Sequence, residues 1–341
     1  MGANLATEYG DISQRTAAWA ATEALAHAEP IAVLSKYGQA KPIPKNTAEG
    51  VKFRAPVPFA PATVALTEGV TPGFQAMSYR PAEATLAQYG AATEISDKIA
   101  DLAEDPVLSD AMMLSGEQAQ ETLELILHGV LKAGTSFMYA NSVAARANVV
   151  TAISISDQRA VTRFLKAQRA KKVTSIVGAS VKVSTEPIDA AFIAFGHTDC
   201  ESDIRDMDGF VPTEKYGQMK SLPYEVGKVE DVRYICSPLF DAWADEGGAA
   251  STMVGTTDSA VHVDVYPIIY ISKDAYGLVT LKGANAIKPM VLNPGTPSKS
   301  DPLGQKGYVS WKTYFAGVIL NEAWMCRLEV ACKDVGTVTS A

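Results

Sequence analysis

The most regular pattern of apolar residues in the chain lies between Asp105 and Gly134. Asp105 suits a helix N-cap, Pro106 suits the first helical position because it has no N–H to satisfy, and Gly134 favours termination. The pattern predicts a helix of about 28 residues, roughly 42 Å long, with one side that another element must cover. Apolar residues recur along that side at three- and four-residue spacing: Leu108, Met112, Ala119, Leu123, Ile126, Leu127, Val130 and Leu131.

A long two-limbed loop is predicted between residues 51 and 96. Apolar and charged residues alternate from Val51 to Ala55, and an alternating pattern returns from Glu83, as in two short β-strands. The prolines of APVPFAP exclude a central strand between them, and TEGVTPG forms a turn cluster. An isolated two-stranded ribbon is marginal in water, so we expect this loop to pack on a neighbouring copy of the chain. The large side chains that would make the contact are Phe53, Phe59, Phe74 and Tyr79.

The late segment PLGQKGYVSWKTYFAGVILNEAWMCRLEV, residues 302–330, is rich in aromatic and β-branched residues. Large apolar side chains occupy both faces of its first half, and Asn321-Glu322 interrupts the pattern. From Trp324 onward, apolar residues alternate with Met325, Arg327 and Glu329, which indicates a strand with one buried face. The pattern predicts a long β-hairpin whose apolar side covers the long helix.

The rest of the chain mixes short elements without a βαβ period. Residues 13–29 predict an Ala-rich helix, and the Pro- and Gly-rich residues after it predict an arm outside the compact domain. Between residues 174 and 282, the stretches DAAFIAFGH, DVRYICSPLF and HVDVYPIIYIS predict strands, and TDCESDIRDM predicts a helix. The fold class expected from these elements is α+β.

A second amphipathic helix is predicted from Ser156 to Lys172. Val161, Phe164 and Leu165 would form its buried face. Two interpretations of its basic face remain open, namely contact with nucleic acid or an acidic partner, and a solvated surface. The basic residues, as a candidate DNA-facing set, are Arg159, Arg163, Lys166 and Arg169.

Charge, cysteine content and the absence of targeting segments argue against a tight nucleic-acid binder, a disulfide-bonded secreted protein and a membrane protein. The formal net charge of the 341 residues is −8, which argues against tight wrapping of nucleic acid over a whole face. The four cysteines are scattered and form no CxxC pair, so free thiols in a reducing compartment are expected. The first residues show no secretory signal, and no stretch approaches the length of a membrane span, so we expect a cytoplasmic protein without membrane contact.

Motifs for catalysis or cofactor binding are absent from the sequence: there is no GxSxG, GxxxxGK[ST], GxGxxG or HExxH. His197 and Cys200 have a spacing that could supply two metal ligands, but no second pair with ligand spacing accompanies them. We interpret them as a strand end followed by a helix with an acidic outer face. His128, on the long helix, is expected to be a packed residue rather than a general base.

The order of these parts is an arm, a β-loop, a long helix, an α+β body and an aromatic hairpin. That order resembles the major capsid protein fold of tailed bacteriophages, which encapsulin nanocompartments and the herpesvirus capsid floor share. Five stretches between residues 34 and 329 are similar to one branch of phage capsid proteins, and the last is the most specific: LSKYGQAKPIPKN, LTEGVTP, LAQYGAATEISDKI, GKVEDVRYI and DPLGQKGYVSWKTYFAGVILNEAWMCRLE.

The resemblance implies a division of the chain into named regions. They are an N-terminal arm at 1–48, an extended β-loop at 49–100, a peripheral domain with a spine helix at 101–149, an axial domain at 150–285 and a return to the peripheral domain as a long β-hairpin at 286–341. It also implies a structural subunit that assembles into hexamers and pentamers of an icosahedral phage head around double-stranded DNA.

Partners and location follow from the same resemblance. The partners would be other copies of the chain, a portal, scaffolding or decoration proteins, and packaged double-stranded DNA through weak contact. The protein would be assembled in the host bacterial cytoplasm and reside in the virion capsid, with no catalytic residue and no cofactor.

Two alternatives remain open at this point. An encapsulin-type nanocompartment shell has the same fold but encloses a protein cargo. A metal-dependent cytoplasmic hydrolase would use His197 and Cys200, and stoichiometric zinc lost on His197→Ala would support it.

Overall fold

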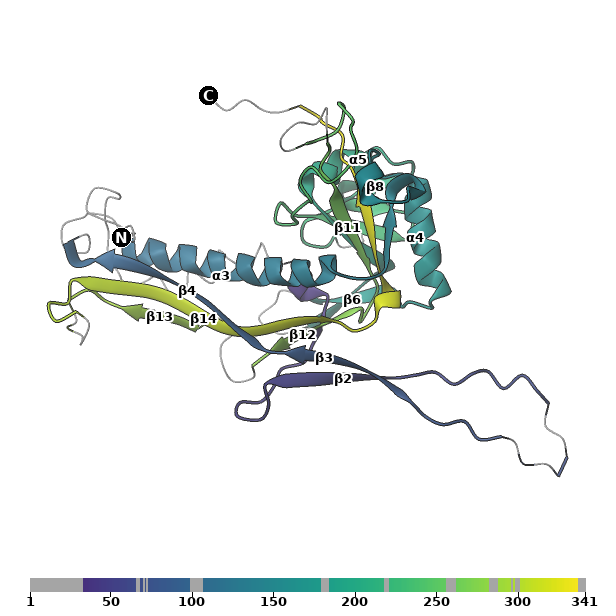
Figure 1. Cartoon of the computed structure of the whole chain (residues 1–341), viewed down its shortest axis with the longest axis horizontal. Coiled ribbons are helices and arrows are strands. Elements are labelled where there is room, and N and C mark those ends of the chain that lie inside the picture. Colours follow the sequence, from purple (N-terminus) through teal and green to yellow (C-terminus); the bar gives the residue numbers. More distant parts are fainter. Residues whose placement is uncertain are drawn as a thin grey trace.

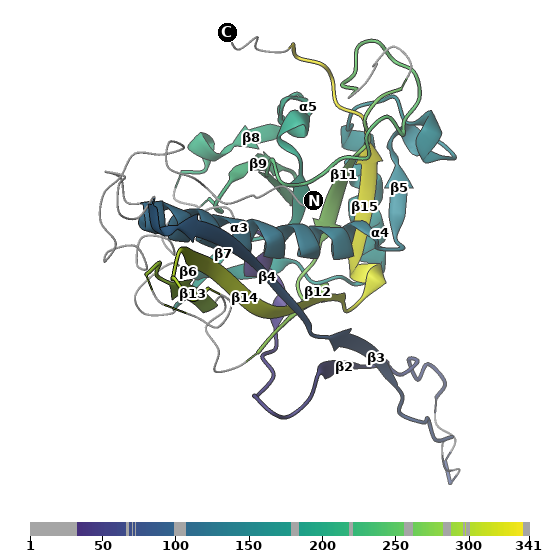
Figure 2. The same cartoon turned by 60° about the vertical axis from the view of Figure 1, so that its left-hand side comes forward.

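A computed structural model of the chain has two β-sheets, a long helix and a projecting ribbon (Figure 1). It describes residues 33–336 apart from 66, 67, 70, 72, 99–106, 179–183, 218–220, 256–261, 282–287, 296 and 298–300. The long helix lies along one sheet, the second sheet stands at one end of that helix, and the ribbon extends away from both. The turned view in Figure 2 shows the same arrangement. No helix among the described residues is both long and apolar enough to cross a membrane.

The predicted long helix is confirmed as α3 (Val107–Lys132). The expected N-terminal residues Asp105 and Pro106 lie outside the described residues. Ala119, Leu127 and Leu131 are fully buried on its apolar side. That side packs on β14 and β4, so a local 3.6-residue period was sufficient to identify the helix and its covered face.

The five-stranded sheet is built around one long strand, β14 (Lys306–Ile319). This strand pairs antiparallel with β4 along residues 87–96, and also with β13 and β12, while the short β1 adds parallel to β12. Aromatic side chains of β14 therefore form the support for α3, as the sequence predicted. The other strands of the sheet are β1 (Gln39–Ala40), β4 (Ala87–Ser96), β12 (Tyr276–Thr280) and β13 (Lys288–Leu292).

The eight-stranded sheet is covered on both faces. Phe192 and Ala194 share one apolar cluster with Leu165 of α4 (Ile155–Ala167), whereas Ile193 and Phe195 lie in a second cluster with residues of α3. Alternate side chains of one strand thus serve two cores. Its strands are β5 (Phe137–Tyr139), β6 (Val173–Gly178), β7 (Ser184–Gly196), β8 (Phe210–Pro212), β9 (Glu225–Val229), β10 (Val232–Cys236), β11 (Tyr266–Ile271) and β15 (Met325–Val330), and the short helix α5 (Glu201–Arg205) follows β7.

The prediction of a C-terminal β-hairpin is wrong. The chain turns at the short helix η6 (Glu322–Trp324), and β15 then enters the eight-stranded sheet between β11 and β5, while β14 stays in the five-stranded sheet. The two strands therefore join the two sheets instead of pairing with each other. Every residue of β15 is buried, including Arg327 and Glu329, which the alternation had placed on a solvated face.

The remaining region boundaries also shift. The ribbon consists of β2 (Gly50–Pro56) paired antiparallel with β3 (Tyr79–Thr85), and residues 87–96 belong to the five-stranded sheet rather than to the loop. Sheet membership does not follow the order of the strands in the chain: β12 lies in the five-stranded sheet, and β5 and β15 lie in the eight-stranded one. Sheet membership depends on contacts distant in sequence, which alternation does not encode.

The arm prediction is wrong for residues 33–43, which are part of the body. Val33 and Leu34 are buried in the cluster that joins α3 to both sheets, and Ile43 is buried against the base of the ribbon. The predicted helix at 13–29 lies outside the described residues.

Candidate functional site

The ribbon of β2 and β3 projects away from the rest of the molecule. Its base is anchored by Phe53, which is only 8% exposed and packs with Ile43, Val279 and Ala316. Phe53 is therefore covered mainly within its own chain, and its contact with a neighbouring copy stays a prediction. Its side chain faces the five-stranded sheet of the same chain, because the residues that cover it are distant in sequence.

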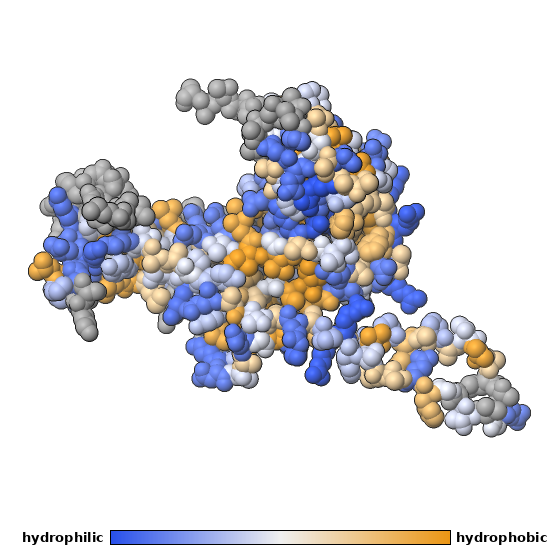
Figure 3. Space-filling model, in the orientation of Figure 1, coloured by the Kyte–Doolittle hydropathy of each residue, from blue (hydrophilic) through white to orange (hydrophobic). Residues whose placement is uncertain are grey.

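The outer part of the ribbon carries exposed apolar side chains. Phe74 is 95% exposed, Phe59 58% and Tyr79 52%, and Val64 and Met77 are exposed beside them. Figure 3 shows the ribbon standing clear of the body with apolar residues along it. Contiguous exposed apolar surface usually marks an interaction site, so the structure leaves the predicted contact residues Phe59, Phe74 and Tyr79 available to a partner.

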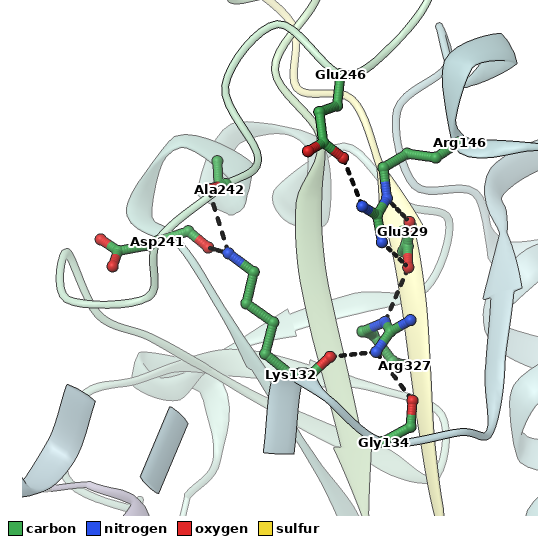
Figure 4. Close-up of polar contacts among 8 residues, drawn as sticks. All are labelled: Lys132, Gly134, Arg146, Asp241, Ala242, Glu246, Arg327 and Glu329. Carbon is green, nitrogen blue, oxygen red and sulfur yellow. Dashed lines mark hydrogen bonds and ion pairs between the residues drawn. The ribbon is translucent and has the colours of Figure 1, made fainter. Parts of the chain in front are cut away.

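A buried charged junction connects the end of α3 to the eight-stranded sheet (Figure 4). Arg327 of β15 donates to the carbonyl oxygens of Lys132 and Gly134, with the second contact at 3.0 Å, and its Nε donates to Glu329 at 2.8 Å. The last carbonyls of a helix have no partner inside the helix, so Arg327 satisfies the final carbonyl of α3, that of Lys132, and also that of Gly134 just beyond the helix.

Glu329 is the centre of this junction and its side chain is 0% exposed. It also accepts from Arg146 at 2.5 Å, and Arg146 forms a second ion pair with Glu246 and lies 3.8 Å from the ring centroid of Trp243. The hydrogen bond to Glu329 raises the pKa of Arg146. Lys132 completes the junction by donating to the backbone oxygens of residues 241 and 242, and burial lowers its pKa. These contacts fix the helix end against one sheet.

A second buried carboxylate holds the start of the described chain against the middle of α3. Glu124 is 2% exposed and accepts the backbone N–H groups of Val33 and Leu34 at 3.0 and 2.7 Å. The hydroxyl of Tyr276 donates to the carbonyl of Leu34 at 2.5 Å. Burial raises the pKa of Glu124. The one sequence signal for this role was an acidic residue within the apolar stripe of the helix.

The basic helix is confirmed as α4, but part of its charge is used within the chain. Arg159 pairs with Glu230 at 2.5 Å and Lys166 pairs with Asp231 at 2.6 Å. Arg163 and Arg169 form no ion pair among the described residues. Phe164, predicted to be buried, is 36% exposed, because only the side of the helix that carries Val161 and Leu165 packs on the sheet.

The histidine and cysteine candidates do not form a reactive site. Cys200 is buried, and Nδ1 of His197 accepts the backbone N–H of Asp199 at 3.1 Å. Within the described ranges, no three His, Cys, Asp or Glu side chains are grouped so that they could hold a metal ion. His128 is confirmed as a packed residue: its ring stacks on Phe240 with centroids 5.0 Å apart, and burial lowers its pKa to about 4.

Comparison with known proteins agrees with this geometry. A family described as "Phage capsid protein" matches residues 80–326, more than half of the chain. The major capsid protein of Pseudomonas phage KPP21 is 26% identical over 132 residues, which cover 36% of this chain and 33% of that protein. The chain therefore aligns with about a third of the length of the curated relative that it matches.

Solved capsid structures share the fold at low sequence identity. The capsid of Ralstonia phage GP4 has a TM-score of 0.66 at 10% identity, with 88% of each chain covered. The capsid of cyanophage Pam1 has a TM-score of 0.60 at 9% identity, with 96% of this chain and 97% of the other covered. The head structure of Helicobacter pylori bacteriophage KHP40 has a TM-score of 0.56 at 10% identity, covering 96% and 95%.

Proposed function

Because the chain belongs to the phage capsid protein family, we propose that it is the repeated structural subunit of a phage head. The observation that carries the proposal is the ribbon, whose outer apolar side chains have no cover within the described chain. If each ribbon packs on the next copy, the contacts between copies are head-to-tail. Such contacts form a closed ring when the rotations between successive copies add up to a full turn.

We infer the finer assignments from the same family. The shell would be icosahedral, made of hexamers and pentamers, and would enclose double-stranded DNA. The unit around α3 and the five-stranded sheet would be the peripheral domain, and the eight-stranded sheet the axial domain. Portal, scaffolding and decoration proteins would be further partners, and the virion the final location.

Contact with the packaged DNA would be weak, since the chain has a net charge of −8. Arg163 on α4 and Arg169 just after its end support such a contact best, because Arg159 and Lys166 are already in ion pairs. Reversal of both charges in R163E/R169E should lower the DNA retained by shells in moderate salt. Unchanged retention would remove this helix from the DNA-facing surface.

Deletion of the ribbon tip, Thr67 to Gly73, tests the central proposal. The deletion removes no residue of the buried clusters, so the subunit should keep its far-ultraviolet circular dichroism and thermal midpoint. Light scattering and negative-stain microscopy should show closed shells or rings for the wild-type chain and none for the deletion. Normal shells from the deletion would contradict the role given to the ribbon.

A further inference from the structure

A groove of about 850 Å³ lies between the base of the ribbon and the body, and its walls come from four parts of the chain. These are the ribbon itself, residues 39–41, the end of α4 with the residues that follow it, and the turn between β14 and β15. Small-molecule sites in proteins have volumes in this range. The groove is therefore large enough for a ligand of the size of a nucleotide.

The charges on this groove are unbalanced. Among the described residues, five cations line it against a single acid, Asp274, which leaves a surplus of four positive charges although the whole chain has a net charge of −8. None of the five forms an ion pair with any described residue. Uncompensated like charges gathered in a concave surface attract an anion. The cations are Lys41, Arg54, Arg80, Arg169 and Lys171.

Arginines reach the groove from both of its sides. Arg80 lies opposite Ala55 in the ribbon, on the same face as Phe53, so it points towards the body. Its Nη1 donates to Oδ1 of Asn321 at 3.5 Å, and a guanidinium has four further N–H donors. On the body side, Arg169 follows α4 with a φ of 54°, a conformation that favours glycine after a helix end. Two planar guanidinium groups can thus bind phosphate oxygens in pairs.

Aromatic side chains line the same groove. The Nε1 of Trp324 donates to the carbonyl of Gln168 at 3.3 Å, which holds the indole against the end of α4. Phe53 is anchored at the base of the ribbon, and Nζ of Lys41 lies 5.3 Å from the centroid of its ring. Cations that contact phosphates beside aromatic rings that stack on a base are the combination that binds nucleotides.

We propose that this groove binds a nucleoside triphosphate, a compact anion that carries a planar base. The triphosphate has about four negative charges at neutral pH, which match the surplus of four positive charges in the groove. An acidic peptide distributes the same charge over about 13 Å of extended chain. A DNA duplex keeps its bases stacked inside the double helix, so it offers no free base to an aromatic side chain.

A ligand in this groove would contact the ribbon and the body at once. It would therefore hold the ribbon in one direction relative to the body. An effect on shell assembly rests on the proposed function, in which the ribbon contacts the next subunit. The binding itself needs no second copy, so it can be measured on the unassembled subunit.

Isothermal titration calorimetry in magnesium-free buffer of low ionic strength tests the ligand class, with ATP as the nucleoside triphosphate. We expect one saturable site per chain for ATP and no measurable binding of adenosine. Inorganic triphosphate should bind at least about fivefold more weakly, because it lacks a base that can stack. Absence of saturable ATP binding would overturn the proposal. Equal affinity for inorganic triphosphate, for a tetraglutamate peptide or for duplex DNA would also overturn it.

Charge reversal tests the location of the site. R80E/K171E should raise the Kd for ATP at least about tenfold, because the two reversals cancel the surplus of four charges. Both side chains are exposed, so the variant should keep its circular dichroism spectrum. K215E/K312E is the matched control, since both lysines are exposed outside the groove and unpaired among the described residues. Equal Kd values for the groove variant and the control would overturn the proposal.

Replacement of Trp324 separates stacking from a general change of structure. W324L should weaken the binding of ATP but leave the binding of inorganic triphosphate unchanged, because only ATP has a base that stacks on the indole. A damaged groove would weaken both ligands alike. Unchanged ATP binding by W324L would overturn the role given to the aromatic wall.

These experiments separate the inference from the proposed function. If the wild-type chain forms shells and does not bind ATP, the groove assignment fails and the shell function stands. If the wild-type chain forms no shells but binds ATP with the expected response of the variants, the groove assignment stands and the shell function fails.

Discussion

Arg327 at the junction of α3 and β15 permits a quantitative prediction. Replacement by methionine keeps the length and the apolar stem of the side chain but removes the guanidinium. The carbonyls of Lys132 and Gly134 would lose the hydrogen bonds from Arg327, and Glu329, which is fully buried, would keep only Arg146 as a charged partner.

The expected loss of stability is large. Removing one partner of a buried ion pair costs about 3–5 kcal/mol, because the other charge stays buried with less compensation. The carbonyls of Lys132 and Gly134, which would lose their donor, should lower the stability further. At about 2 °C per kcal/mol for a chain of this size, R327M should lower the thermal midpoint by roughly 6–10 °C.

Thermal unfolding of the unassembled subunit, followed by circular dichroism, measures the effect. Arg159→Met is the matched control, since Arg159 also forms an arginine–glutamate pair but on the exposed surface, and its midpoint should stay unchanged. The double variant R327M/E329Q should lose less than the sum of the two single variants, because the charges interact directly. A loss below about 1 kcal/mol for R327M would refute the reasoning that the junction is a buried, mutually dependent network.

Four further outcomes follow from buried or closely packed residues. E124A should destabilise the chain by about 2–4 kcal/mol, measured by urea unfolding, because two buried N–H groups lose their acceptor, Oε1 of Glu124. E124Q keeps an amide oxygen that can accept from both N–H groups, so it should lose less. Burial raises the pKa of Glu124, so the folded state binds its proton more tightly; stability should rise as the pH falls from above that raised pKa towards the ordinary 4.5, and E124Q should lose this rise. G317V should cost about 1–3 kcal/mol by the same urea measurement, since even a Cβ there would lie 2.8 Å from Cδ1 of Leu127. The cysteines should resist a thiol reagent at about pH 8 until the chain unfolds, because all four are buried and burial raises the pKa of Cys326 to about 12; fast labelling of the native protein would contradict this.

Prediction from the sequence was accurate where a single segment carried the information. The period of the α3 stripe depends on neighbours three and four residues away, so the helix and its covered face could be identified without the fold. The strands β7, β10 and β11 were identified for the same reason, from runs of apolar and β-branched residues. The exposure of Phe59 and Phe74 followed from the prolines and the turn cluster around them.

Prediction failed where partners are distant in the chain. The spacing of β14 and β15 resembles a hairpin, yet the turn after Asn321 sends β15 to pair with β11, in a sheet to which β14 does not belong. Phe53 has the same pattern as the exposed residues of the ribbon, and only the position of the five-stranded sheet buries it.

The sequence by itself therefore determined most of the strands and helices, the covered face of α3, the lack of known catalytic motifs and the family resemblance. Only the tertiary structure decided which strands share a sheet. It alone placed Arg327 and Glu329 in a buried charged junction, and it alone set Glu124 against the backbone of Val33. It also brought five cations from separate segments into one groove. The physical reason is that periodicity is a local property of the chain, whereas burial and charge balance are set by groups that only folding brings together.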